Sequence, residues 1–193
     1  ILAAVKKGRV TDAVIRFLSF IGNSLPNFVV SLLLLYFFAL KLGWFPILSS
    51  GSPISLVLPT LALAIPMTGK YIRQVRAAVL EQLGRQYVDG AVSRGLKRRK
   101  VLFGYVLQNA LVTIITLMSM SIGSLLGGTA AIEMLFVMPG MGYMVTNAVT
   151  SRDYPVIQGF VVWMSVIYIF INLLTDLAYY YLDPRIGAGM EVK

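Results

Sequence analysis

Residues 101–132 read VLFGYVLQNALVTIITLMSMSIGSLLGGTAAI, a run of 32 residues without a single charged side chain. Three further runs also lack Asp, Glu, Lys and Arg: residues 17–40, 42–69 and 154–175, which are 24, 28 and 22 residues long. A helix needs about 20 apolar residues to cross the hydrocarbon core of a bilayer. Four such runs in 193 residues are typical of a polytopic membrane protein made of α-helices.

The overall composition supports the same class, because 58% of the residues are hydrophobic and a soluble protein usually holds about 45–50%. We predict an all-α helical bundle with about four transmembrane helices, forming one transmembrane domain over residues 1–193. The chain has no Cys and no His, so it lacks thiolate chemistry, the commonest metal ligand and the commonest general base. We therefore expect no catalytic site, no metal site and no enzyme on this chain.

The net charge of +9 is distributed unevenly along the chain. Four basic residues precede the first apolar run, and nine of the seventeen lie in the segment Lys70–Lys100 between the second and third runs. The other two connections hold only Lys41 and Arg152. This alternation is the positive-inside pattern, so the start, the segment 70–100 and the C-terminus are predicted to be cytoplasmic. No soluble domain presents the basic residues to a phosphate backbone, and we expect no nucleic-acid partner.

The first residues predict that the sequence is a piece of a longer protein. Ile1–Val5 followed by Lys6-Lys7 is typical of the cytoplasmic end of a preceding apolar helix. No signal peptide is expected, because a charged n-region and a small-residue cleavage site are both missing. The first charge-free run carries Asn23, Pro26 and Asn27. Polar side chains beside a proline face either protein or a water-filled path, and the pattern leaves both open.

Residues 133–150 are apolar, although they follow the third predicted span on the outer side. Turn signals interrupt them at Pro139-Gly140-Met141-Gly142. An apolar segment of this length favours a re-entrant or surface-lying helix over an ordinary loop.

The charged segment has an organised centre at about 82–100. At helical spacing, Tyr87, Val88, Ala91 and Val92 share one face. Gly95 stands where a left-handed cap would end this helix, and Leu96 begins a second, strongly basic helix. The pattern predicts a helix–glycine–helix unit at the cytoplasmic surface. Gly90 and Ala91 leave a low-relief face that would fit a groove on another protein, whereas a simple membrane anchor would not need small residues.

The pattern Asp89-Gly90-Ala91-x-x-x-Gly95 resembles the EAA-x-x-x-G loop of ABC importer permeases, with Asp for Glu and Gly for the first Ala. The closest resemblance is to the permeases for dipeptides, oligopeptides and nickel. The general pattern continues to a Leu-Pro pair, which is Leu107-Gln108 in this chain, and these permeases share that departure. The resemblance covers nearly the whole chain in order. The matching segments are Tyr87-Val88, Ala91, Gly95-Leu96, Leu107–Ala110, Gly127-Gly128, Glu133, Pro139–Gly142, Arg152–Gly159 and Leu182–Arg185.

The resemblance implies a type I permease of the bacterial or archaeal cytoplasmic (inner) membrane, usually with six spans, of which this chain holds the last four. It also implies a sister permease subunit, two cytoplasmic ATPase subunits and an extracytoplasmic substrate-binding protein. ATP and Mg would be bound by the ATPase subunits, and no G-x-x-x-x-G-K-[ST] loop occurs on this chain. The expected ATPase-coupling residues are Tyr87, Asp89, Gly90, Ala91, Arg94, Gly95 and Leu96.

We therefore expect a membrane subunit of an ATP-driven importer that forms the translocation path for peptides or a related small solute. Nickel or a metal chelate is the alternative cargo. An ion-coupled secondary carrier is a distant alternative, because it would use ionisable residues near the membrane midplane and the charge-free runs supply none. The weaker candidates for lining the path are Asn109, Thr113, Thr116, Ser119, Ser121 and Ser124.

Overall fold

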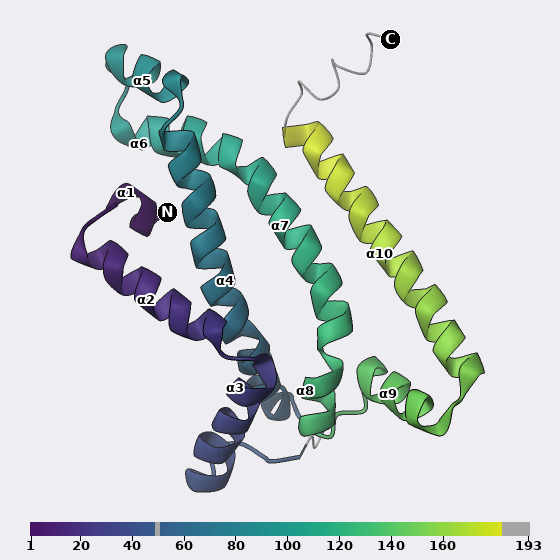
Figure 1. Ribbon diagram of the computed structural model, residues 1–193. Helices are drawn as coiled ribbons and strands as arrows, with labels where there is room; N and C mark the ends of the chain where they lie inside the picture. The colour runs from purple at the N-terminus through teal and green to yellow at the C-terminus, as the bar shows by residue number, and fades with distance from the viewer. Residues whose placement is uncertain (49–50, 183–193) are drawn as a thin grey trace, which may run out of the picture. The chain divides into compact units, whose positions relative to one another are not determined.

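The computed structural model describes residues 1–48 and 51–182, and none of these residues forms a β-strand (Figure 1). Helices follow one another with short connections. In chain order the elements are α1 (Leu2–Val5), α2 (Val10–Ser24), α3 (Asn27–Leu34), the π-helix η1 (Leu35–Lys41), the 3-10 helix η2 (Pro53–Leu56), α4 (Val57–Leu83), α5 (Gln86–Ser93), α6 (Arg98–Val101), the π-helix η3 (Leu102–Val106), α7 (Leu107–Gly128), α8 (Ala130–Leu135), α9 (Met141–Ser151) and α10 (Tyr154–Leu182).

Three continuous helical stretches within the described ranges are long and apolar enough to cross a membrane: Pro53–Leu83, Arg98–Leu125 and Tyr154–Tyr181. The stretch predicted as the first span is broken, since Val10–Ser24 and Asn27–Lys41 meet at an angle of 94°. Pro26 lies at the break with an extended backbone, φ −59° and ψ 145°, and it has no N–H to continue the helical ladder. If the bent pair is one span, the described chain has four, which confirms the predicted fold class.

The chain divides into two compact units. The first unit holds residues 1–17 and 71–122 and the described residues from 169 onward, and the second holds residues 18–70 and 123–168. The long helix α4 contributes residues to both. The prediction of one transmembrane domain over residues 1–193 stays a prediction.

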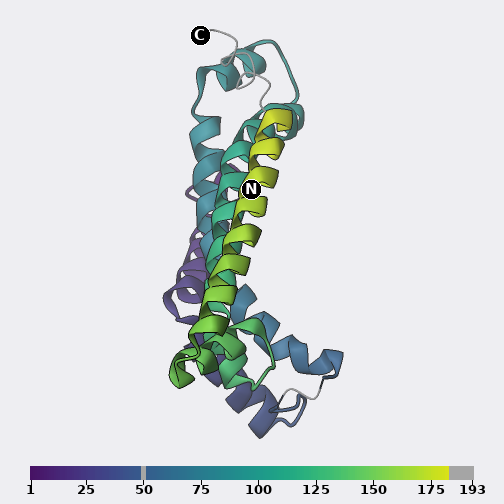
Figure 2. The same cartoon turned by 90° about the vertical axis from the view of Figure 1, so that its right-hand side faces the viewer.

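The core of the first unit consists of small aliphatic side chains. Its buried members are Ala4, Ala78, Val79, Val88, Ala91, Val101, Val106 and Ala110. Figures 1 and 2 show α5 and α6 beside the end of α4 that contributes to this core. Residues of this size let helix backbones approach closely, so packing contacts hold helices together without a large hydrophobic driving force.

The second basic helix predicted after Gly95 is not a separate surface helix. Its residues form α6, which continues through η3 into α7 as one stretch, Arg98–Leu125. Lys97 is extended, with φ −58° and ψ 133°, and marks the start of this stretch. No glycine or proline lies between Lys97 and Phe103, so nothing ends the helix before the apolar run begins. The basic side chains are thus the first turn of the third span.

A buried ion pair joins α2 to α4 within the first unit. Arg76 donates from Nε to Asp12 Oδ1 and from Nη2 to Asp12 Oδ2, both at 2.8 Å. The Gly8 N–H donates to Asp12 Oδ2 at 3.1 Å, and Arg16 Nε lies 3.6 Å from Oδ1. Asp12 is only 1% exposed. A carboxylate this deeply buried is tolerated because several donors replace its lost hydration.

In the second unit, α2 and α4 cross with their backbones in contact. A Cβ on Gly69 would stand 2.6 Å from the Ser19 carbonyl oxygen and 2.9 Å from the Asn23 nitrogen. A separate apolar core in this unit contains Ala39, Leu58, Ala62, Ile132 and Phe136.

The predicted outer segment contains α8 and α9, which lie side by side in the second unit (Figure 1). Glu133 on α8 accepts a hydrogen bond from the Tyr143 N–H in the first turn of α9 at 2.8 Å. A Cβ on Gly140 would collide with the Glu133 carboxylate, and one on Gly142 would stand 2.6 Å from Ala130 Cα. The two glycines of the Pro139–Gly142 motif therefore permit a carboxylate cap and a close helix contact. Whether the segment is re-entrant or surface-lying stays a prediction.

Replacing Gly142 by Ala should lower the melting temperature of the purified protein in detergent. The new methyl group would press against the backbone of Ala130, and overpacking of this kind costs about 1–3 kcal/mol. Gly159→Ala is the matched control, because a Cβ there would meet nothing within 4 Å. Equal melting temperatures for the two variants would contradict the close contact between α8 and α9.

Asp12→Asn should destabilise the protein strongly, because Arg76 would lose its anionic partner in a buried site. Arg76→Lys should have a smaller effect, since it keeps the charge and loses the paired geometry. The control is Glu81→Gln, which breaks an exposed ion pair with Arg85 and should cost about 0–1 kcal/mol. Thermal melting measures all three, and equal losses for Asp12→Asn and Glu81→Gln would argue against a structural role of the buried pair.

Candidate functional site

The first helix and the glycine turn of the unit predicted near residue 90 are present, and a specific cap closes the helix. Within it, the Leu96 N–H donates to the Ala91 carbonyl oxygen at 3.3 Å and the Gly95 N–H to that of Val92 at 2.9 Å. Gly95 has φ +77°. This hydrogen-bond pair around a left-handed residue is the Schellman arrangement. The prediction of a left-handed cap at Gly95 is confirmed.

Burial divides the predicted apolar face of α5 into two parts. Val88 and Ala91 are buried in the core of the first unit, at 7% and 6% exposed, whereas Tyr87 and Val92 are 36% and 54% exposed. The expectation that Ala91 belongs to an accessible low-relief surface is therefore wrong, because this side of the helix packs against its own chain. Gly90 is half-buried, and a Cβ there would meet nothing within 4 Å.

The exposed side of α5 and its cap carries charge. Asp89 and Arg94 are both exposed. Asp89 lies in the first turn of α5, where the helix dipole favours a negative charge. The basic residues after the cap, Lys97 to Lys100, are exposed as well. The unit thus presents one acidic group among several basic ones, a surface suited to a partner with mixed charge.

Tyr87 ties α5 to α4 and lies near α7 in the first unit. Its hydroxyl donates to Gln82 Oε1 on α4 at 3.0 Å. Asn109 on α7 lies near this hydroxyl, and its own Nδ2 donates to the Tyr105 carbonyl oxygen at 2.8 Å. Partial burial raises the pKa of the Tyr87 hydroxyl, and the neighbouring Asn109 opposes this. One residue predicted for coupling and one predicted for the path are thus brought together.

A cavity of about 620 Å³ lies on the inner side of α5. Its walls come from α1, the end of α4, α5 and α6, and include Ala4, Leu83, Val88, Val92, Leu96 and Val101. Beside this cavity, α5 contacts the rest of its unit through the buried side chains of Val88 and Ala91 and through the hydrogen bond of Tyr87 with Gln82.

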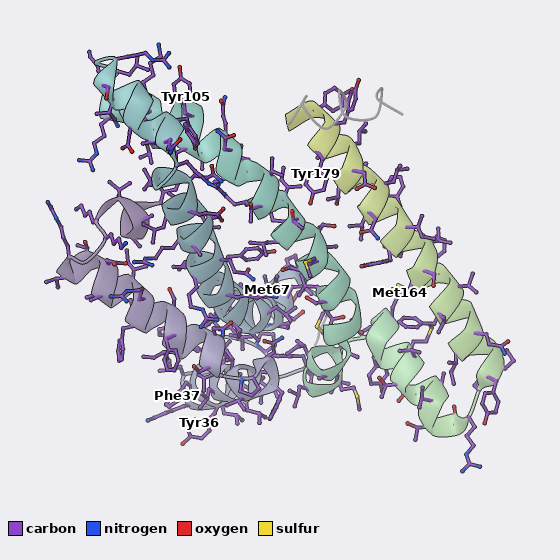
Figure 3. The ribbon with its side chains drawn as sticks, turned by 45° about the horizontal axis from the view of Figure 1, so that its top comes forward. Tyr36, Phe37, Met67, Tyr105, Met164 and Tyr179 are labelled. Atoms are coloured by element: carbon purple, nitrogen blue, oxygen red, sulfur yellow. The ribbon has the colours of Figure 1, made fainter. Side chains whose placement is uncertain are left out.

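The residues predicted to line a path are spread along α7. In the first unit, Tyr179 on α10 points toward α7 and donates to Thr116 Oγ1 at 2.5 Å (Figure 3). Thr175 donates to Ser119 Oγ at 2.8 Å. These two contacts join α7 to α10. The remaining candidates lie elsewhere: Asn109 beside Tyr87, Thr113 exposed, Ser121 buried and Ser124 in the second unit. That these residues line a path stays a prediction.

Reasoning from the sequence missed the pairing of Asp12 with Arg76, because 64 positions separate the two residues and no local pattern connects them. In residues 1–48 and 51–182, no three acidic side chains converge where a metal ion would bind. The expectation that this chain carries no cofactor stays a prediction.

Comparison with known proteins identifies the relatives of this arrangement. Residues 1–188 match the family described as "Binding-protein-dependent transport system inner membrane component". The chain is 38% identical to the probable peptide ABC transporter permease protein y4tP of Sinorhizobium fredii, with 96% of this chain and 62% of the relative covered. It is 39% identical to the dipeptide transport system permease protein DppB of Bacillus subtilis, covering 96% and 60%.

A third relative has a different cargo in its name. The metal-staphylopine import system permease protein CntB of Staphylococcus aureus is 33% identical, with 98% of this chain and 60% of the relative covered. The chain spans about three fifths of the length of these relatives. The family match covers nearly all of the chain and agrees with its apolar helices. The chain is a membrane protein that belongs to the binding-protein-dependent transport system inner membrane component family.

Proposed function

We propose that this chain is the larger part of a permease subunit of an ATP-driven importer, and that the α5–Gly95 unit is the element through which an ATPase drives it. The observation that carries this proposal is the construction of that unit. Its exposed residues carry charge, and a Schellman cap closes the C-terminal end of α5. The buried side of α5 packs against α4 and α7. A segment that only connected two spans would need neither the cap nor this packing.

The mechanism is mechanical. Closure of the ATPase presses on the exposed side of Tyr87–Leu96. The Schellman cap keeps the short helix from unwinding under this load, and Val88 and Ala91 carry the displacement to the core formed with α4 and α7. The spans then rock between inward-open and outward-open states. In this scheme Asp89, Arg94 and Leu96 contact or align the ATPase, and Gly95 sets the direction of the tip.

The proposed assembly contains a sister permease subunit, two cytoplasmic ATPase subunits and an extracytoplasmic substrate-binding protein. ATP and Mg bind to the ATPase subunits, and this chain contributes no catalytic group. Peptide relatives at 38% and 39% identity favour a peptide or a related small solute as cargo. The metal-staphylopine relative favours a metal chelate as the second candidate. Copurification of an ATPase with the tagged chain separates this proposal from an ion-coupled carrier.

Gly95→Asp should leave the subunit inserted and assembled while abolishing the ATP hydrolysis that the loaded binding protein stimulates. A Cβ at this position would meet nothing within 4 Å, so the new side chain blocks no internal packing. It would strain a backbone at φ +77° by about 1–2 kcal/mol and would add a negative charge at the tip. The measurement is ATPase activity of the reconstituted complex with and without loaded binding protein.

Gly43→Asp is the matched control. Gly43 also has a left-handed backbone, with φ +65°, and open space around its Cα, but it lies after the first apolar run on the predicted outer side. The control should keep the stimulated activity. Wild-type stimulation in Gly95→Asp, with normal transport, would refute the coupling role of the unit.

A further inference from the structure

The second unit contains a polar cavity of about 380 Å³ at the break between α2 and α3. Chain segments far apart in the sequence form its walls: the break itself from Asn23 to Asn27, one side of α4, and the end of α7. Met67 on α4 is one of its lining residues (Figure 3). The contact of α2 with α4 at Gly69 holds Asn23 close to the neighbouring Lys70. The volume lies within the range of about 300–1,000 Å³ that is usual for small-molecule sites.

Three polar side chains in this wall have no internal partner. Within the part of the chain that the structure describes, the side chains of Asn23, Asn27 and Lys70 make no hydrogen bond or ion pair, although all three are half-buried. Lys70 directly follows a charge-free run of 28 residues. Lys70 therefore lies at the predicted cytoplasmic end of the second span, where a cation that faces a cavity and has no partner in the protein can bind an anionic group. Among the described residues, Gln74 Oε1 is the only buried side-chain nitrogen or oxygen without a hydrogen-bond partner. The polar atoms of Asn23, Asn27 and Lys70 therefore remain accessible to a ligand in the cavity.

The backbone at the break adds further donors. The N-cap of α3 is Pro26, and no side chain caps this end. The N–H groups of Val29 and Val30 donate to the Pro26 carbonyl oxygen at 3.0 and 3.2 Å, so only the first two N–H groups of α3, those of Asn27 and Phe28, lack a helical partner. At breaks of membrane helices such ends face anionic groups of transported solutes. The uncapped end of α3 is independent of the three unpartnered side chains. The helix end and the side chains both point to a ligand that accepts hydrogen bonds.

The charge of the lining decides the chemistry of the ligand. Lys70 is cationic, two amides stand beside it, and no Asp or Glu is among the residues that line the cavity. The cavity wall thus offers one cation, several hydrogen-bond donors and no acidic side chain. A carboxylate matches this wall, because it is an anion that accepts hydrogen bonds at both oxygens.

We propose that this cavity is a subsite for the carboxylate group of the transported solute. The Lys70 ammonium binds the carboxylate, and the amides of Asn23 and Asn27 hold the atoms next to it. The inference rests on the proposed function, since it places the subsite on the path of an importer. It also narrows the cargo to solutes that carry a carboxylate, which includes free peptides and carboxylate-bearing metal chelates.

The test compares a dipeptide with its C-terminal amide in the complete importer reconstituted in liposomes. For each cargo, the kcat/KM of a variant is divided by that of the wild type, so that the preference of the binding protein cancels. Lys70→Gln should lower this ratio at least about tenfold for the dipeptide, as expected for loss of a hydrogen bond to a charged group, and leave the ratio for the amide unchanged. Lys70→Arg should restore most of the dipeptide ratio.

Lys41→Gln is the control, because Lys41 is an exposed lysine in the same unit that does not line the cavity. The same variants are also measured with a carboxylate-bearing nickel chelate as cargo. This comparison shows whether the carboxylate that binds belongs to a peptide or to a chelate. A loss that the chelate shares with the dipeptide supports a subsite for any carboxylate-bearing solute, and a loss for the dipeptide alone supports a subsite for peptides. Equal ratios for dipeptide and amide would overturn it. A Lys70→Gln defect that disappears when anionic lipid is replaced by zwitterionic lipid would also overturn it, since Lys70 would then bind lipid phosphate.

A second measurement does not require transport. The solubilised wild-type complex is treated with an amine-acylating reagent, and the modification of Lys70 is compared with that of Lys41 by mass spectrometry. The dipeptide should slow acylation of Lys70 only, and its amide should not. If the wild type fails to accumulate any cargo with ATP but the dipeptide protects Lys70, the proposed function fails and the subsite stands. Absence of protection refutes the subsite even in a complex that transports.

Discussion

The absence of water in the hydrocarbon core of a membrane is the constraint on which the rest of this structure depends. A backbone polar group in that core must find its partner within the protein, so most of the described residues in the charge-free runs are helical and the charges lie at or beyond the ends of these runs. Where the helical ladder is interrupted, at Pro26 between α2 and α3, the loss must be compensated locally. The polar cavity of the second unit lies at this interruption.

The same constraint separates structural polar groups from functional ones. Asp12 is buried, and Arg76 and the Gly8 N–H satisfy it, so it holds α2 against α4. Glu133 is satisfied by the first turn of α9. Lys70 and its two neighbouring asparagines are half-buried and have no partner in the part of the chain that the structure describes. The proposal of a ligand site rests on this last group, because its side chains line a cavity.

The α5–Gly95 unit shows how far local patterns reach. The cap at Gly95 was predictable, because a Schellman cap involves only residues within six positions of one another. The apolar side of α5 was predictable from helical spacing as well. The surface that covers this apolar side was not predictable. Periodicity shows that a helix face is apolar, but it does not show what that face packs against. Val88 and Ala91 therefore lie in the core of their own unit, although the sequence equally allowed them to face another protein.

Membrane class, the position of the apolar helices and the family were all accessible from residue order, because hydropathy, helical spacing and turn residues act over a few neighbouring positions. The pairing of Asp12 with Arg76, the contact of Gly142 with Ala130 and the cavity at Lys70 emerged only in three dimensions. Each depends on how far a helix is rotated about its axis and how deep it lies against another helix. Many distant contacts set these two quantities together, and no single stretch of the chain contains them.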